Sequence, residues 1–169
     1  MIPTLQTERL DLRPPTRADF PAYAAVMQSD RARFMGGPLS LDDAWYDFAG
    51  ALVGWTLDGR GYWSVWERST NTLAAFVGFG HSTEDPEPEL GWFTTPEGEG
   101  RGIAFEAAKA AQAFGIADPD LPTFVSYIDP GNARSIALAK RLGCTLDPDA
   151  EPQDEGDLVF RHPATGGQA

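Results

Sequence analysis

Residues 89–108 read ELGWFTTPEGEGRGIAFEAA, a strand-like segment, a glycine-rich loop and the start of a helix in direct succession. The segment from Glu89 to Thr95 predicts a strand, which Pro96 ends. Three glycines then alternate with other residues, and Gly100 or Gly102 opens a helix with one apolar face. Glycines let the backbone approach a ligand closely, and exposed N–H groups at a helix start favour phosphate. We therefore predict a pyrophosphate-binding loop.

Two familiar phosphate-binding motifs do not fit this loop. A P-loop requires a Lys followed by Ser or Thr after its last glycine, and the chain has no such pair. A dinucleotide fingerprint requires Gly-x-Gly-x-x-Gly, but its third glycine falls on Ile103 or Phe105 when counted from Gly98 or Gly100. The loop alone leaves open that it is an ordinary turn.

The segments on either side predict the rest of the fold. Thr16, Ser40 and Asn132 have the character of helix N-caps, and Gly143 suits the position just after a helix. Strand patterns fall at residues 7–13, 61–67, 73–80, 123–128, 144–146 and 158–161. This order predicts an α/β (α+β) fold with one mixed, mostly antiparallel sheet of about six to seven strands, about four helices, and a parallel pair where a helix intervenes.

Length and composition are those of one domain. The chain has 169 residues, of which 42% are hydrophobic, enough for a core without metals. We expect a domain over residues 1–162 and a loose tail over residues 163–169. The single cysteine, Cys144, excludes an internal disulfide and suits a reducing cytoplasm. No signal peptide or long apolar run is present, so we expect a cytoplasmic protein with no membrane partner.

The net charge of −12 limits the possible partners. Binding to nucleic acid needs clustered Lys and Arg, which are scarce, so we expect no nucleic-acid partner. A negative field instead attracts cations, including amines, although acidity can also serve solubility alone.

Three motifs together resemble those of the GNAT superfamily of acyl-CoA-dependent N-acetyltransferases. The coenzyme motif of that family, Gln/Arg-x-x-Gly-x-Gly/Ala, matches residues 97–102 at both glycines. Residues 7–14, TERLDLRP, resemble the opening strand of its RimJ/RimL branch, the ribosomal-protein-alanine N-acetyltransferases. Residues 132–135, NARS, and 140–144, KRLGC, resemble that branch's second motif. The resemblance covers nearly the whole chain and implies a GNAT-like fold.

Two departures from the family pattern affect the site. Glu97 stands where the family has Gln or Arg, and with Glu99 it places negative charge beside a pyrophosphate. Arg101 is a candidate to compensate. Ala139 stands where many relatives carry a tyrosine that protonates the leaving thiolate. The RimJ/RimL branch tends to have a serine earlier in this helix, which matches Ser135.

The resemblance implies direct transfer of an acetyl group from acetyl-CoA, as cosubstrate, to a primary amine of a protein N-terminus or a small molecule. No metal and no covalent enzyme intermediate are implied, and Cys144 is interpreted as a core residue. The alternative is a non-catalytic acyl-CoA-binding or regulatory module on the same fold, and a protein that binds ATP or NAD is a third hypothesis. A homodimer is the simplest oligomer to expect.

Candidate site residues follow from these motifs. Glu89 is the first candidate for a general base and Ser135 for the donor to the thiolate, while Asp129, His81 and a base-free reaction remain alternatives. A backbone N–H near Phe93 is expected to face the oxyanion, where one donor is typically worth ~3 kcal/mol. Arg134, Lys140 and Arg141 are candidates to reach the coenzyme's phosphates, although surface charges would look the same in sequence. The expected coenzyme-binding residues are Trp92, Phe93, Thr94, Glu97, Gly98, Glu99, Gly100, Arg101, Gly102, Ile103, Ala104, Asn132, Arg134 and Ser135.

The acceptor is less well defined by the sequence. By resemblance, the first two helices and nearby loops build its pocket. Phe34, Met35, Trp45 and Trp55 are the candidates there, although their residue types favour a core position. The acidic segments 85–89 and 147–157 are a hypothetical attraction for a basic peptide or a polyamine.

Overall fold

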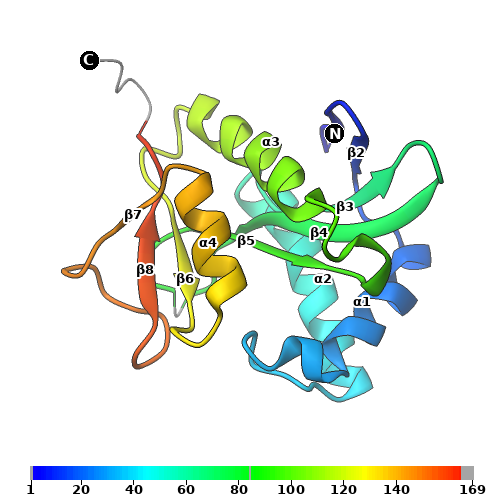
Figure 1. The fold of residues 1–169 in the computed structure, drawn as a ribbon, viewed down its shortest axis with the longest axis horizontal. Helices are drawn as coiled ribbons and strands as arrows, with labels where there is room; N and C mark the ends of the chain where they lie inside the picture. The colour runs from blue at the N-terminus through cyan, green and yellow to red at the C-terminus, as the bar shows by residue number, and fades with distance from the viewer. Residues whose placement is uncertain (1, 84, 165–169) are drawn as a thin grey trace.

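Eight strands form one sheet in the order β1-β2-β3-β4-β5-β6-β8-β7 in the computed structural model, which describes residues 2–83 and 85–164 (Figure 1). Most of the predicted tail therefore lies outside the described residues. The strands are β1 (Leu5–Gln6), β2 (Leu10–Arg13), β3 (Tyr62–Glu67), β4 (Thr72–Gly80), β5 (Glu89–Thr94), β6 (Val125–Ile128), β7 (Thr145–Leu146) and β8 (Leu158–Arg161).

Four α-helices flank the sheet, α1 (Phe20–Met27), α2 (Leu41–Leu57), α3 (Ile103–Ala117) and α4 (Ala133–Arg141). Local capping explains where they begin. The Ser40 hydroxyl accepts from the Asp43 N–H at 3.1 Å, and the Asn132 side chain accepts from the Ser135 N–H at 3.2 Å. Short 3₁₀ turns at residues 17–19, 30–32 and 96–98 complete the described helical segments.

The sheet is antiparallel except between β5 and β6, which run parallel. α3 connects these two strands, as a parallel pair requires. The prediction of a mixed, mostly antiparallel sheet with four helices is thus confirmed. The structure adds β1, a two-residue strand that pairs with β2 and is too short to show a repeating pattern in sequence.

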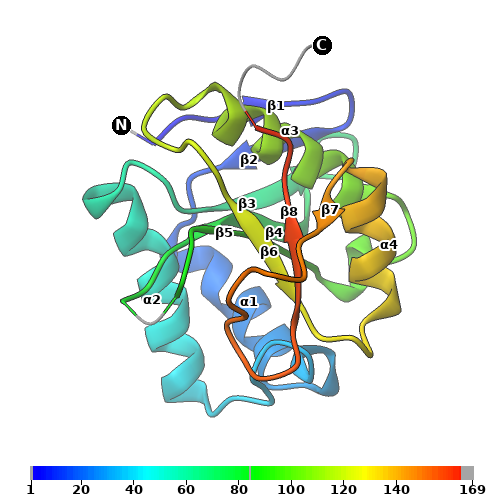
Figure 2. The same ribbon diagram turned by 90° about the vertical axis from the view of Figure 1, so that its left-hand side faces the viewer.

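The two faces of the sheet carry separate cores (Figure 2). α3 and α4 pack on one face over residues that include Trp63, Val77 and Leu90. α1 and α2 pack on the other face around an aromatic cluster that includes Phe48 and Phe76. Each face of β5 therefore serves a different compartment of the molecule, because successive side chains of a strand point to opposite faces.

No helix in the described part of the chain is long and apolar enough to cross a membrane. The described residues also hold no group of three or more His, Cys, Asp or Glu side chains placed to bind a metal ion.

Candidate active site

The glycine-rich loop between β5 and α3 needs its glycines for two different reasons. A Cβ at Gly98 would lie 2.0 Å from the carbonyl oxygen of Ala74, so this glycine lets the loop pack on β4. Gly100 and Gly102 have φ angles of 73° and 74°, in the left-handed region that favours glycine. Gly100 and Gly102 therefore shape the loop itself, whereas Gly98 allows its contact with β4. Gly102 is the N-cap of α3, which resolves the choice between Gly100 and Gly102 as the residue that opens the helix.

The first turn of α3 presents backbone donors without a side-chain cap. Gly102 has no side chain to accept from them, and the intrahelical bonding begins with Glu106 N–H donating to the Gly102 carbonyl at 3.1 Å. The N–H groups of the three residues before Glu106 have no intrahelical acceptor, because a helix bonds each N–H to the carbonyl four residues back. With the helix dipole, this geometry suits an anion.

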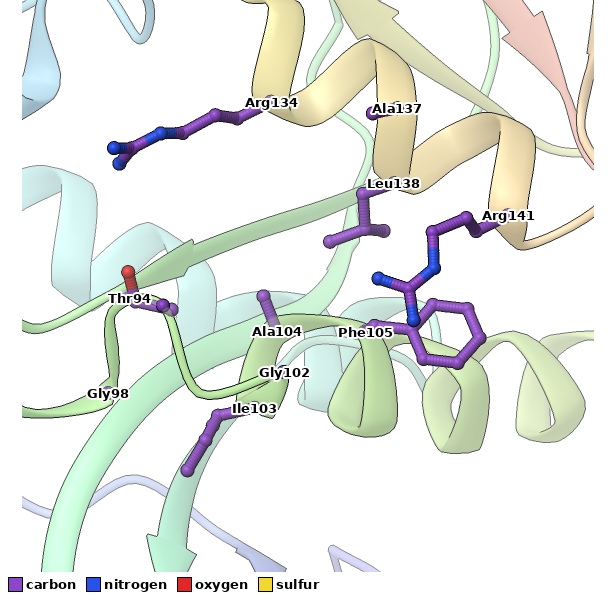
Figure 3. A pocket seen from close by; sticks show the side chains of 11 residues that line it. Thr94, Gly98, Gly102, Ile103, Ala104, Phe105, Arg134, Ala137, Leu138 and Arg141 are labelled. Atoms are coloured by element: carbon purple, nitrogen blue, oxygen red, sulfur yellow. The ribbon is translucent and has the colours of Figure 1, made fainter.

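A cleft of about 150 Å³ opens at this helix start, between the loop and α4. Figure 3 shows Leu138 and Arg141 projecting from α4 toward the first turn of α3. Arg134 also lines the cleft, and the lining contains no carboxylate among the described residues. The cleft is therefore locally positive on a strongly acidic protein. The lining residues are Thr94, Gly98, Gly100, Gly102, Ile103, Ala104, Phe105, Arg134, Ala137, Leu138 and Arg141.

Three of the lining residues, Phe105, Ala137 and Leu138, were not predicted from the sequence, whereas Arg141 was a candidate for the phosphates. The Arg141 guanidinium lies 4.0 Å from the Phe105 ring centroid. Ala137 and Leu138 lie three and four residues after Arg134 on α4, and this spacing carried the signal, since it places side chains on one helix face. Trp92, Phe93, Glu97, Glu99, Arg101, Asn132 and Ser135 were predicted and do not line this cleft.

Neighbouring arginines neutralise Glu99. Its carboxylate is paired with Arg31 and with Arg134, and these contacts lower its pKa. The Glu97 side chain is exposed outside the cleft. The repulsion of a phosphate by Glu97 and Glu99 is therefore weaker than the sequence indicates.

Arg101 does not direct its charge into the cleft. Its guanidinium binds the buried Glu67 carboxylate at 2.6 and 2.9 Å, at the end of β3. The prediction that Arg101 compensates for Glu97 is not supported, because this ion pair faces the strand rather than the ligand space.

The N-terminal segment, residues 7–14, contacts the first turn of α3. The Thr7 hydroxyl donates to the Glu106 carboxylate at 2.5 Å, and the Arg9 guanidinium binds it at 2.7 Å. A second Arg9 nitrogen donates to the Arg101 carbonyl at 3.1 Å. Residues almost a hundred positions apart thus fix the loop and the first turn of α3 in one orientation.

Below the cleft, β5 separates from β6 after a single ladder pair, Glu89 opposite Val125. The Val125 N–H donates to the Pro88 carbonyl at 3.0 Å, while the Thr95 N–H donates to β4. Backbone groups alternate in direction along a strand, so even-numbered residues of β5 face β6. Trp92 and Thr94, rather than Phe93, therefore direct their backbone N–H and C=O groups into the gap.

Glu89 lies where the two strands part. Its carboxylate is half-buried and accepts a hydrogen bond from the Tyr127 N–H. Burial, and to a lesser degree the negative charge of Asp85, raises the pKa of Glu89 to about 7, despite the stabilising contact with Tyr127. A carboxyl group with this pKa can accept a proton from an ammonium ion near neutral pH.

Tyr62 reaches Glu89 across two glycines. Tyr62, Gly78 and Gly91 lie opposite one another on β3, β4 and β5. A Cβ at Gly91 would lie 2.2 Å from the Tyr62 hydroxyl oxygen and 3.9 Å from a Glu89 carboxylate oxygen. Burial, with Glu89 adding to it, raises the pKa of Tyr62 well above its usual range, so the phenol stays protonated. Tyr62 could not be predicted from the sequence because this row of residues depends on strand register.

The remaining sequence candidates occupy ordinary structural positions. Ser135 is half-buried in the first turn of α4, where its N–H is capped by Asn132. Asp129 accepts from the Gly131 N–H at 2.6 Å in a turn, and His81 is exposed. Ala139 and Cys144 are buried, and burial raises the pKa of the Cys144 thiol to about 12. That thiol is therefore a poor nucleophile.

The acceptor candidates are divided between the two faces of the sheet. Trp45 and Met35 pack on the α1–α2 side around Phe48 and Phe76, where Phe93 stacks on Phe76 with ring centroids 5.2 Å apart. Trp55 packs on the core of the other face, and its indole donates to the Tyr62 carbonyl at 2.8 Å. These contacts give the three candidates core roles, whereas Phe34 is half-buried in the segment before α2 beside the Arg33 guanidinium.

Part of the acidic surface is neutralised. The Arg161 guanidinium binds both Glu87 oxygens at 2.7 and 2.8 Å and Asp147 at 2.8 Å. Asp85 accepts from the Gln153 amide at 2.6 Å, which brings the two predicted acidic segments together. Their net field is therefore weaker than the count of carboxylates predicts.

Comparisons with known proteins agree with this geometry. A family model described as the acetyltransferase (GNAT) domain matches residues 9–145. The acetyltransferase from Agrobacterium tumefaciens str. C58 is 44% identical, with a TM-score of 0.92 over 96% of this chain and 95% of that chain.

Two more distant solved structures share the fold. An acetyltransferase of the GNAT family from Bacillus anthracis is 20% identical, with a TM-score of 0.71 over 94% of this chain and 95% of that chain. RimL, the ribosomal L7/L12 alpha-N-protein acetyltransferase in complex with coenzyme A, is 16% identical, with a TM-score of 0.76 over 96% of this chain and 99% of that chain.

Proposed function

The chain belongs to the GNAT acetyltransferase family, and from this premise we propose that it transfers an acetyl group from acetyl-CoA directly to a primary amine. The acceptor is an amine of a small molecule or of a protein N-terminus. Glu89 acts as general base, and no covalent enzyme intermediate forms.

One observation carries this proposal above the others. The uncapped first turn of α3 opens into a cleft lined by Arg134 and Arg141, directly beside the separated strands β5 and β6. The residues present fit a coenzyme with a pyrophosphate and an extended arm: backbone donors and arginines for the phosphates, and strand backbone for the arm. RimL, which has the same fold, binds coenzyme A.

Glu89 supplies the proton acceptor. An alkylammonium has no lone pair for attack, so its proton must leave first. The carboxylate takes that proton, and the neutral amine then attacks the acetyl carbonyl carbon of the thioester that acetyl-CoA brings. The Tyr62 phenol, whose oxygen lies close to Gly91 as a Glu89 carboxylate oxygen also does, orients the amine by a hydrogen bond.

Backbone and helix residues stabilise the charges that develop. The N–H groups of Trp92 and Thr94 point into the gap and are placed to donate to the carbonyl oxygen as it becomes an oxyanion. The Ser135 hydroxyl is the candidate donor to the departing thiolate, because Ala139 leaves the usual tyrosine position without a donor. The C–N bond forms and the C–S bond breaks without a covalent enzyme intermediate.

Release of the coenzyme thiol tests the proposal. Purified protein is incubated with acetyl-CoA and a panel of primary amines and peptides with free N-termini, and thiol is measured with a disulfide reagent. We expect at least one amine to give turnover that Glu89→Gln lowers and Asp42→Asn, a change on the exposed start of α2, does not. Equal rates for all three proteins would contradict the assignment of Glu89.

A non-catalytic acyl-CoA-binding module is the second candidate, because Ala139 and Glu97 depart from the family pattern. It predicts acetyl-CoA binding with no thiol release from any amine in the panel. Acetylated product detected by mass spectrometry, in an amount that grows with time and enzyme, would exclude it.

A further inference from the structure

The last hydrogen bonds between β5 and β6 involve side chains rather than the ladder. After the Glu89–Val125 pair, a continuing parallel ladder would have the Tyr127 N–H donate to the Leu90 carbonyl. The Tyr127 N–H instead has the Glu89 carboxylate as an acceptor. The Leu90 carbonyl accepts the Ser126 hydroxyl at 2.6 Å. Both halves of the next ladder bond are thus engaged by side chains.

The Ser126 contact fixes the protonation of a buried histidine. A carbonyl only accepts, so the single Ser126 hydroxyl hydrogen goes to Leu90. The Ser126 oxygen lies 2.9 Å from Nε2 of His162, and this contact must therefore have His162 as the donor. His162 carries its hydrogen on Nε2, and its Nδ1 is left as an acceptor.

Gln112 of α3 completes the chain of bonds from the other side. Its amide nitrogen lies 2.9 Å from Nδ1 of His162 and donates its second hydrogen to the Leu142 carbonyl at 3.1 Å. The directions agree from end to end: Gln112 donates to His162, His162 to Ser126, and Ser126 to Leu90. This relay joins α3, the residue after β8, β6 and β5.

The relay is rigid and electrically neutral. Gln112, Ser126 and His162 are 7%, 2% and 4% exposed, and the His162 ring stacks on Phe124 at 4.6 Å. Among the described residues, Cys144 is the one titratable group in contact with His162, with its sulfur 3.3 Å from Nδ1. Burial lowers the pKa of His162 to about 3, so the ring stays neutral at ordinary pH.

We propose that Ser126 and His162 are positioning residues that hold β5 and β6 apart for the thioester. The proposal rests on the proposed function in one respect, that acetyl-CoA binds between these strands. Ser126 donates to the Leu90 carbonyl in place of the Tyr127 N–H, which disfavours continuation of the ladder and keeps the backbone groups of Trp92 and Thr94 available. His162 keeps Ser126 in that orientation, and Glu89 secures the other strand through Tyr127.

A purely stabilising network would predict different behaviour. Removing any buried hydrogen bond lowers the melting temperature, so stability alone does not separate the two roles. Ser64→Ala is the matched control, because Ser64 is also a buried serine of the same sheet and donates to Asp19 at 2.9 Å, away from the gap. Ser126→Ala tests the relay at Leu90, and His162→Phe tests it one step back while keeping a ring against Phe124.

Crystal structures of the ligand-free wild-type and Ser126→Ala proteins test the positioning directly. We expect the variant to form the Tyr127–Leu90 ladder bond and to narrow the gap. An unchanged gap, with a water in place of the hydroxyl, would overturn the proposal. This readout needs neither coenzyme nor turnover, so it is independent of whether the protein is a transferase.

Calorimetric titration with acetyl-CoA gives the functional readout. We expect Ser126→Ala to raise Kd by ~10-fold, His162→Phe to raise it by less, and Ser64→Ala to leave it unchanged despite a similar loss of melting temperature. A closed gap with an unchanged Kd would show that the relay shapes the sheet without positioning the coenzyme, and would also overturn the proposal. Absence of binding by the wild-type protein would instead count against the proposed function.

Discussion

In the proposed reaction, the Glu89 carboxyl group has two roles, because it accepts a hydrogen bond from the Tyr127 N–H and takes a proton from the acceptor amine. Its pKa of about 7 comes chiefly from burial. Burial penalises the charged form, so the group is ionised only above neutral pH. A cost in stability accompanies this function, since a folded-state pKa above the usual 4.5 means that folding is favoured less as pH rises through 7.

Glu89→Gln should therefore lose activity and gain stability at alkaline pH. We expect kcat/KM to fall by ~100-fold, and the wild-type acid limb near pH 7 to disappear from the residual activity. Above pH 7 the melting temperature of the variant should exceed that of the wild type, while near pH 4 the two should agree. A pH–rate profile and melting curves across that range provide the check. An acid limb that persists in the variant would assign the base elsewhere.

Two variants test Tyr62, one that removes its hydroxyl group and one that displaces it. Their effects on activity should agree. Tyr62→Phe deletes the hydroxyl, while Gly91→Ala puts a methyl 2.2 Å from it and forces the phenol to move. We expect each to lower kcat/KM by ~10-fold through KM for the amine, with acetyl-CoA affinity retained. Tyr23→Phe, which loses a 2.6 Å bond to Asp47 in the same aromatic cluster, is the control for stability. Full activity in Gly91→Ala would remove Tyr62 from the site.

At the scale of elements, α4 contributes charge to a cleft built by another helix. Arg134 is largely exposed and pairs with Glu99, which also binds Arg31. An exposed pair of this kind is worth little to stability, so its significance lies in the ligand it can meet. Arg134→Ala should weaken acetyl-CoA binding several-fold, as the loss of a charge-assisted contact predicts. Lys140→Ala, on the same helix but outside the cleft, should not, and calorimetry distinguishes them. Equal affinity in both variants would contradict the phosphate role of Arg134.

Elements were predictable where their signals are local. Ser40 and Asn132 marked helix starts, and the glycine-rich loop marked the start of α3, because capping and positive φ involve residues close in sequence. Ala137 and Leu138 could be assigned to the cleft only once α4 was placed against α3. The row of Tyr62, Gly78 and Gly91 depends on pairing across three strands, which no single strand encodes.

Two side chains illustrate the same limit. Arg101 was expected to serve the phosphates, yet Glu67, buried at the end of β3, binds its guanidinium. The hydrogen bonds of His162 all depend on residues distant in sequence. Its partners Gln112 and Ser126 lie 50 and 36 positions away. Charge and hydrogen-bond partners are tertiary properties, whereas the loop's shape is a local one.

At the scale of the whole molecule, His162 should govern part of the acid sensitivity. Its folded-state pKa of about 3 lies below the usual 6.5, so the unfolded chain binds the proton more readily. The stability contributed above pH 6.5 is therefore lost as pH falls from 6.5 toward 3. In His162→Gln the melting temperature should fall less steeply between pH 6.5 and 4, whereas exposed His81→Gln should follow the wild type. Parallel slopes in all three proteins would exclude His162 as a source.

The cleft, the separated strands β5 and β6 and the family membership all indicate that the protein binds acetyl-CoA. The most direct measurement is the melting temperature with and without saturating acetyl-CoA, with ATP and NAD as comparisons. A ligand that binds only the folded state raises the melting temperature by mass action. At a ligand concentration of a hundred times its Kd, the free energy of unfolding rises by about 2.7 kcal/mol. We expect a clear rise with acetyl-CoA and none with ATP or NAD. No rise with acetyl-CoA, or a larger rise with either nucleotide, would contradict it.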